Sequence, residues 1–200
     1  MNIYTIIRLS ELLGEMGNVR RGTKLPNGEF ESDSHHSFSL ALIAYYIVTA
    51  HCPELDVNKV VLYALVHDLL EIVTGDEDTL HYTPKQFAQK HEREKAALAQ
   101  FKDMFATYPE LKDAMLEYEK LDTPEAATVF VLDKACTTWT HFWDKGAYAK
   151  ERNIANSTKV IEWADRQRSK FTMRLVAMPP QKIFDIYEQS FEALKGLYED

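Results

Sequence analysis

The chain has 200 residues with a formal net charge of −8 at neutral pH, and 46% of its residues are hydrophobic. This length suits one folded domain, and the acidic balance argues against a nucleic-acid polymer as partner, because such binders neutralise phosphates with a basic surface. No apolar run reaches the ~18 residues that a membrane helix needs. The two cysteines lie in or beside apolar segments, which predicts reduced thiols in a cytoplasmic protein.

Apolar periodicity predicts an all-α protein that forms a single domain over residues 1–200. We expect no strand, because no stretch alternates convincingly with period two. The predicted elements are a first helix ending near residue 17, a long irregular segment at 17–34, helices at about 35–51, 60–75 and 84–107, a shorter helix opening at 109, a helix from 124 through 133, and helices at 157–178 and 180–198.

The segment 60–76, VVLYALVHDLLEIVTGD, has an unusual pattern of polar residues. Between positions 60 and 73 the only ones are His67, Asp68 and Glu71. A helix that is apolar on nearly all sides is normally buried, and buried carboxylates are found neutralised, paired or bound to metal. On a helix these three side chains lie on one side, so His67 and Asp68 could share one metal ion.

Two other apolar segments carry isolated ligand-type residues. His35 and His36 open the run HHSFSLALIAYYIVTA, and Asp133 lies inside VFVLDKAC. Either histidine could supply an imidazole, and the Ser37 that follows favours His36. The resulting set is His36, His67, Asp68 and Asp133. Two imidazoles and two carboxylates suit one divalent ion such as Mn, Co, Mg, Fe or Zn.

The order H…HD…D resembles that of the HD-domain metal-dependent phosphohydrolases. ESDSHHS at 31–37 and HDLLEIVTGD at 67–76 resemble the first two motifs of the small HD hydrolases typified by bacterial 5′-deoxynucleotidase. Asp133-Lys134 resembles the third. The resemblance covers about residues 20–143 and implies a helical bundle with a metal site between its central helices. It also implies a homodimer that hydrolyses deoxyribonucleoside 5′-monophosphates to nucleoside and phosphate.

The resemblance further implies roles around the metal. Asp76 matches an aspartate that contacts the substrate or the attacking water. Glu71 matches a glutamate close to the metal, where it could orient or deprotonate water, with a buried ion pair as its structural alternative. His35 stands where the family commonly has an acidic residue, so it is expected on the substrate side of the site.

Basic residues near these motifs are candidates for phosphate binding. Arg20 or Arg21 could form a bidentate pair with a phosphate, although two adjacent arginines are more often surface charge. Lys134 could contact phosphate or pair with Glu71.

Two other functions stay open. The same fold could cut deoxynucleoside triphosphates to nucleoside and triphosphate, which more basic residues along the pocket would favour. The protein could also be a catalytically silent, metal-containing module that binds a metabolite or a partner protein.

Overall fold

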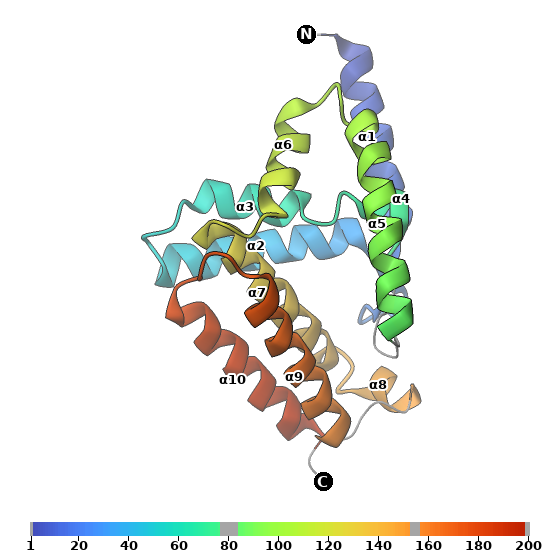
Figure 1. The fold of residues 1–200 in the computed structure, drawn as a ribbon. Helices are drawn as coiled ribbons and strands as arrows, with labels where there is room; N and C mark the ends of the chain where they lie inside the picture. Colours follow the sequence, from blue (N-terminus) through green and yellow to red (C-terminus); the bar gives the residue numbers. More distant parts are fainter. Residues whose placement is uncertain (1, 77–83, 153–156, 199–200) are drawn as a thin grey trace.

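The computed structural model describes residues 2–76, 84–152 and 157–198 (Figure 1). Within these ranges it confirms the all-α prediction, with one small two-stranded sheet added. The α-helices are α1 (Ile3–Asn18), α2 (Asp33–His51), α3 (Val57–Val66), α4 (Glu71–Thr74), α5 (Pro84–Met104), α6 (Pro109–Tyr118), α7 (Pro124–Trp139), α8 (Ala147–Glu151), α9 (Ser157–Arg174) and α10 (Gln181–Leu197); the strands are β1 (Arg20–Lys24) and β2 (Phe30–Ser32), and a 3₁₀ turn, η1, covers Thr140–Phe142.

The main hydrophobic core lies where α2, α3 and α7 meet (Figure 1). Helix α7 is buried continuously from Ala126 to Asp133, as expected of a helix that is apolar on nearly all sides. Fully buried side chains from the three helices fill this core, among them Leu40, Ala44, Val60, Ala64, Val129 and Leu132. His36 of α2 and Asp133 of α7 are buried polar residues on helices that form this core.

Residues 17–34 do not form the predicted irregular segment. Strands β1 and β2 pair antiparallel, and the loop between them closes with hydrogen bonds from Leu25 N to Glu29 O (2.8 Å) and from Gly28 N to Leu25 O (2.9 Å). Gly28 has a φ of 87°, a conformation that glycine adopts without steric cost. The strands are too short and too polar for an alternating pattern to be recognised from the sequence.

The predicted central helix is divided in two. Helix α3 ends at Val66, and α4 begins only at Glu71. Between them the backbone forms tighter i→i+3 hydrogen bonds, from Leu69 N to Val66 O (3.1 Å) and from Glu71 N to Asp68 O (2.9 Å). The predicted end near Gly75 is confirmed by its φ of 70° at the α4 C-cap. His67 and Asp68 therefore lie in the turn after α3.

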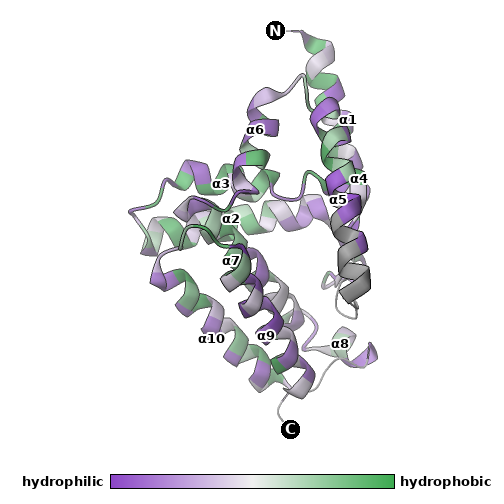
Figure 2. Ribbon diagram, viewed as in Figure 1, coloured by the Kyte–Doolittle hydropathy of each residue, from purple (hydrophilic) through white to green (hydrophobic). Residues whose placement is uncertain are grey.

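The remaining elements match the predictions with shorter ends. Helix α5 ends at Met104 and α9 at Arg174, a few residues earlier than expected, whereas η1 and α8 were not predicted. Figure 2 shows α9 as mainly hydrophilic, in contrast to α7. Both cysteines are buried and unpaired. Among the described helices, none combines the length and apolarity that crossing a membrane requires.

Candidate metal and phosphate site

Three of the four predicted metal ligands come together in the core. His36 from α2, His67 from the turn after α3, and Asp133 from α7 are all buried, and their ligand atoms lie within 4.8 Å of one another. His36 Nε2 lies 3.0 Å from Asp133 Oδ1. These residues are far apart in the sequence, so the packing of three helices creates the group.

The hydrogen bond of His67 fixes which of its ring nitrogens can bind a cation. Its Nδ1 donates to the carbonyl oxygen of Ala64 (2.9 Å), which leaves a lone pair on Nε2. Nε2 is buried without a hydrogen-bond partner, although it lies 2.9 Å from Asp68 Oδ2. A lone pair facing a carboxylate oxygen is stabilised only by a cation or a proton between them. The donor set therefore fits a divalent ion.

The pKa shifts in this group also indicate a place for positive charge. Burial lowers the pKa of His67, but the carboxylates of Asp68 and Asp133 outweigh burial and raise it. Burial opposes ionisation of Asp133, yet Lys134 and His36 hold the pKa of this carboxyl well below its usual range. The carboxylates thus remain ionised in the core, where anions need a compensating cation.

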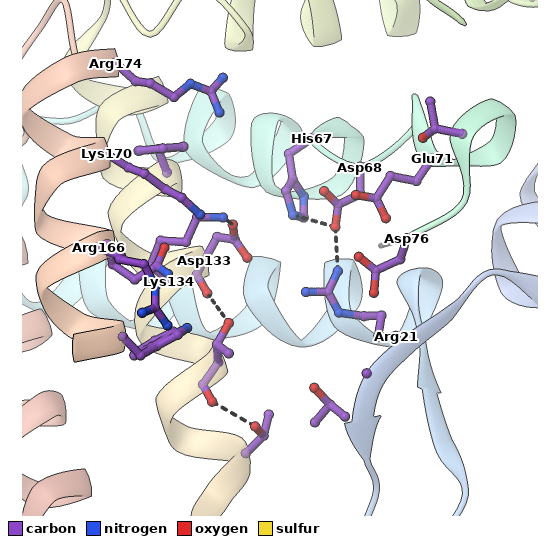
Figure 3. Close-up of a pocket in the computed structure, with 18 of the residues that line it drawn as sticks. Arg21, His67, Asp68, Glu71, Asp76, Asp133, Lys134, Arg166, Lys170 and Arg174 are labelled. Carbon is purple, nitrogen blue, oxygen red and sulfur yellow. Dashed lines mark hydrogen bonds and ion pairs between the residues drawn. The ribbon is translucent and has the colours of Figure 1, made fainter. Parts of the chain in front are cut away.

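A second acidic group adjoins the first, and two of its members, Asp68 and Glu71, lie near Arg21 in Figure 3. Ligand atoms of Asp33, Asp68 and Glu71 lie within 4.8 Å of one another. Arg21 Nη1 lies 3.0 Å from Asp68 Oδ2 and 3.3 Å from Asp33 Oδ1, and its Nε lies 3.5 Å from Glu31 Oε2. The carboxylate of Asp68 therefore connects His67 on one side to Arg21 on the other.

Asp33 and Glu71 differ from Asp68 in their protonation. Burial, and then repulsion from Asp68, raises the pKa of Asp33 to about 6. Burial together with Asp68 and Asp33 raises the pKa of Glu71 well above its usual range. For Asp68 burial acts in the same direction, but His67 and Arg21 outweigh it and lower its pKa. Asp68 is therefore the most readily ionised of the three, whereas Glu71 and, to a lesser degree, Asp33 hold their protons more strongly than ordinary carboxyls.

The raised pKa of Asp33 predicts a pH-dependent stability. The ordinary value is 3.8 and the folded value is about 6, so this side chain favours the folded state fully below pH 3.8 and loses that contribution as pH rises through 6. In metal-free protein, the difference in free energy of unfolding between Asp33→Asn and wild type should therefore change by about 3 kcal/mol in favour of the variant between pH 4 and pH 8. Urea unfolding across this range measures the difference. Parallel curves for the two proteins would contradict the prediction, and the exposed Asp122→Asn is the control.

The other predicted site residues lie in different environments. Asp76 and Lys134 line the same pocket as Asp68, and Lys134 Nζ contacts Asp133 rather than Glu71. Alternation along β1 leaves Arg20 exposed and turns Arg21 inward, with 15% of its side chain exposed. His35 is half exposed, does not line the pocket, and lies 3.3 Å from Glu31 Oε1 through Nδ1.

The sequence prediction omitted several residues that the structure places at the site. Glu31 and Asp33 are buried acids that contact Arg21. Both belong to the ESDSHHS motif, and this motif was the feature of the sequence from which they could have been recognised. Tyr118 is buried at the end of α6 with its ring centroid 6.0 Å from that of His67. No pattern in the sequence near Tyr118 indicated this contact.

The two groups open into a large cavity of about 1060 Å³ (Figure 3). Its lining includes His67, Asp68 and Asp133 together with residues of α9. Small-molecule sites usually measure ~300–1,000 Å³, so this cavity has room for a nucleotide. A buried His/carboxylate group in such a cavity can bind a cation and hold an anionic ligand against it.

Comparisons with known proteins agree with this geometry. Residues 13–172 match the family model of the HD domain. Mouse 5′-deoxynucleotidase HDDC2 is 31% identical over 133 residues, which are 64% of this chain and 64% of the mouse protein. The Dictyostelium discoideum protein of the same name is 28% identical over 182 residues, which are 86% of this chain and 89% of the Dictyostelium protein. The chain thus spans slightly less than two thirds of the mouse relative.

Two solved structures share the fold. A predicted metal-dependent phosphohydrolase from Magnetospirillum magnetotacticum superposes with a TM-score of 0.71 at 19% identity, covering 98% of this chain and 97% of the other. A Pyrococcus horikoshii protein superposes with a TM-score of 0.58 at 23% identity, covering 96% of this chain and 99% of the other. At these identities the likeness concerns the arrangement of the helices.

Proposed function

Because the chain belongs to the HD-domain family, we propose that it is a divalent-metal-dependent phosphohydrolase that converts deoxyribonucleoside 5′-monophosphates to nucleoside and phosphate. The observation that carries the proposal is the buried Nε2 of His67, which has no hydrogen-bond partner and faces Asp68. The 5′-deoxynucleotidases among the relatives support the choice of substrate. The large cavity beside His67 supports a ligand of nucleotide size.

We assign His36, His67, Asp68 and Asp133 as the ligands of one divalent ion. Asp68 lies 2.9 Å from His67 Nε2, so it can join the three residues that already form a group. Mixed nitrogen and oxygen donors are compatible with Mn, Co, Mg, Fe or Zn. Such an ion, when bound, polarises a phosphoryl oxygen and acidifies water.

Other side chains have roles set by their positions. Glu71, which lies in the pocket beside Asp68, accepts a proton from the attacking water. Arg21 holds Asp68 in place and offsets negative charge in the pocket. Lys134 stabilises charge on the phosphate, and Asp76 orients the sugar oxygen that leaves.

Replacing Glu71 by glutamine tests this assignment. The variant keeps the shape of the side chain but cannot accept the proton, so kcat for dAMP should fall by about 10²–10⁴-fold. Phosphate release measures turnover, in metal-stripped protein resupplied with Mn, Co or Mg. Metal content measured on the same samples should remain that of wild type.

The exposed Glu15→Gln provides the matched control and should retain turnover. Glu71→Gln with full activity would remove Glu71 from the mechanism. A wild-type protein that binds metal but releases no phosphate from any deoxynucleotide would overturn the enzymatic proposal, and a silent binding module would then explain the site better.

We also propose that the protein is a cytoplasmic homodimer. Helix α2 exposes large apolar side chains at Phe38, Leu42, Tyr45 and Tyr46, each more than half exposed. A contiguous patch of this kind commonly marks a protein interface. Light scattering should give twice the chain mass of 23.1 kDa, and a monomer mass would reject the dimer.

A further inference from the structure

The pocket extends along α7, away from the candidate metal ligands. Asp133 lines it at the metal group, and Thr137, Thr140 and His141 line it on the following turns of α7 and η1. These positions follow one another at three- to four-residue spacing, so they lie on one side of the helix. At ~1.5 Å per residue, His141 lies roughly 12 Å along the axis from Asp133. A nucleotide whose phosphate is held beside Asp133 can therefore extend its nucleoside part toward His141.

The wall of the pocket near His141 is apolar. Ala149 of α8, Trp163 of α9 and Leu194 of α10 line the pocket and belong to one hydrophobic cluster, together with Tyr198. The hydroxyl oxygen of Tyr198 lies 2.7 Å from His141 Nδ1, which places the imidazole beside this cluster. Small-molecule sites commonly combine an apolar wall with a few polar groups. A nucleobase has the matching character, because its faces stack and its edges form hydrogen bonds.

A hydrogen-bonded turn holds His141 in place. The carbonyl oxygen of His141 accepts from the backbone N–H of Gly146 (2.8 Å). The carboxylate of Asp144 accepts from the N–H groups of Gly146 (2.9 Å) and Tyr148 (2.7 Å). Gly146 has a φ of 75°, and a Cβ at this position would lie 2.6 Å from Cε1 of Tyr198. Glycine at position 146 therefore lets the ring of Tyr198 approach His141 without displacement.

Tyr198 determines which nitrogen of His141 carries the proton. Burial lowers the pKa of His141, so its imidazole is neutral near neutral pH and has one N–H. Burial, together with Asp144, raises the pKa of Tyr198 to about 12, so its hydroxyl keeps its proton. Within the described ranges this hydroxyl has no acceptor other than His141 Nδ1, and it therefore donates to that nitrogen. The N–H of the imidazole is then on Nε2, and a ligand in the pocket that His141 lines can accept from it.

We propose that His141 binds the nucleobase of the substrate, by donating from Nε2 to a ring nitrogen or carbonyl oxygen of the base. The base lies against Ala149, Trp163 and Leu194. This inference rests on the proposed function, because the metal group holds the phosphate of the same nucleotide. Purine and pyrimidine bases both carry acceptors on their edges. His141 touches neither the phosphorus nor the attacking water, so it contributes to substrate binding and leaves the chemical step to the metal group.

The test compares dAMP with deoxyribose 5-phosphate, which has the same ester bond but no base. Replacing His141 by phenylalanine keeps a ring and removes the N–H. Loss of one hydrogen bond should lower kcat/KM for dAMP by about three- to tenfold, mainly through KM. The variant should cleave the base-free ester as well as wild type does. Phosphate release by protein resupplied with Mn measures both reactions.

His141→Gln separates the hydrogen bond from the packing of the ring. The amide of glutamine can accept from Tyr198 and donate to the base, so this variant should retain more activity on dAMP than His141→Phe. If the imidazole only packs against Tyr198, phenylalanine will be the milder replacement, and that order would overturn the assignment. His51→Phe changes an exposed histidine outside the pocket lining and is the matched control, which should keep the wild-type ratio of the two substrates.

Calorimetry with deoxyadenosine gives a readout that does not require catalysis. Wild type should bind deoxyadenosine about three- to tenfold more tightly than His141→Phe. Equal binding by the two proteins, or an equal loss of activity on dAMP and the base-free ester, would overturn the base contact and leave the nucleotidase proposal standing. If wild type cleaves neither ester but binds deoxyadenosine through His141, the proposed function fails and the base contact is supported.

Discussion

Replacing Asp133 by alanine is expected to reduce kcat/KM for dAMP by about 10³-fold or more, which corresponds to the several kcal/mol that metal-ion catalysis supplies. The buried carboxylate of Asp133 lies 3.0 Å from His36 Nε2 and contacts Lys134. Its removal takes one anionic ligand from the group and leaves His36 without this partner. Metal content after dialysis should fall together with turnover.

The control for this variant is Asp122→Ala, which removes an exposed carboxylate just before α7. It should retain both metal and activity. Circular dichroism and thermal unfolding of Asp133→Ala, compared with wild type, separate loss of the site from loss of the fold. A folded Asp133→Ala protein that keeps its metal and its turnover would remove Asp133 from the proposed ligand set.

Replacing Arg21 by methionine is expected to lower the free energy of unfolding of the metal-free protein by about 3–5 kcal/mol at pH 8, as is usual when one partner of a buried ion pair is removed. Arg21 contacts Glu31, Asp33 and Asp68, and two of these acids are almost completely buried. Without the guanidinium, their charges repel one another in the core. Chemical denaturation measures the loss.

The neighbouring Arg20→Met is the matched control, since Arg20 is exposed on the same strand and should change stability little. The loss in Arg21→Met should shrink as pH falls and the carboxyls take up protons. Added divalent ion should recover part of it, because a second cation can neutralise Asp68. Equal stabilities of the two variants at pH 8 would show that Arg21 does not hold the acidic group together.

The sequence predicted the candidate ligands because they are polar residues in segments too apolar to face water. Such residues must meet partners when the segments pack, and His36, His67 and Asp133 do meet. Asp33 was harder to recognise, since an acidic residue directly after the N-cap Ser32 is also typical of an ordinary helix start. Its burial against Arg21 depends on where the hairpin packs.

Other features depend on three-dimensional placement that no local pattern encodes. Separating Arg21 from Arg20 requires knowing that the residues lie on a strand. The change from α3 to α4 falls within a stretch that is apolar apart from His67, Asp68 and Glu71, so periodicity could not locate the turn after α3. Arg166 and Lys170 line the pocket from α9, but their four-residue spacing is what any solvated helix face shows. Only the packing of α9 beside α7 turns that face toward a cavity.

The long sequence separations within the site have a consequence for folding. Arg21 and Asp68 are 47 positions apart, and His36 and Asp133 are 97 apart. Contacts of such range cost more loop-closure entropy than local contacts, so we expect them to form after the local helices. During most of folding these charges remain hydrated and separate, and the chain avoids the cost of burying them singly. We therefore expect the capacity to bind an ion to appear only when α2, α3 and α7 have come into contact.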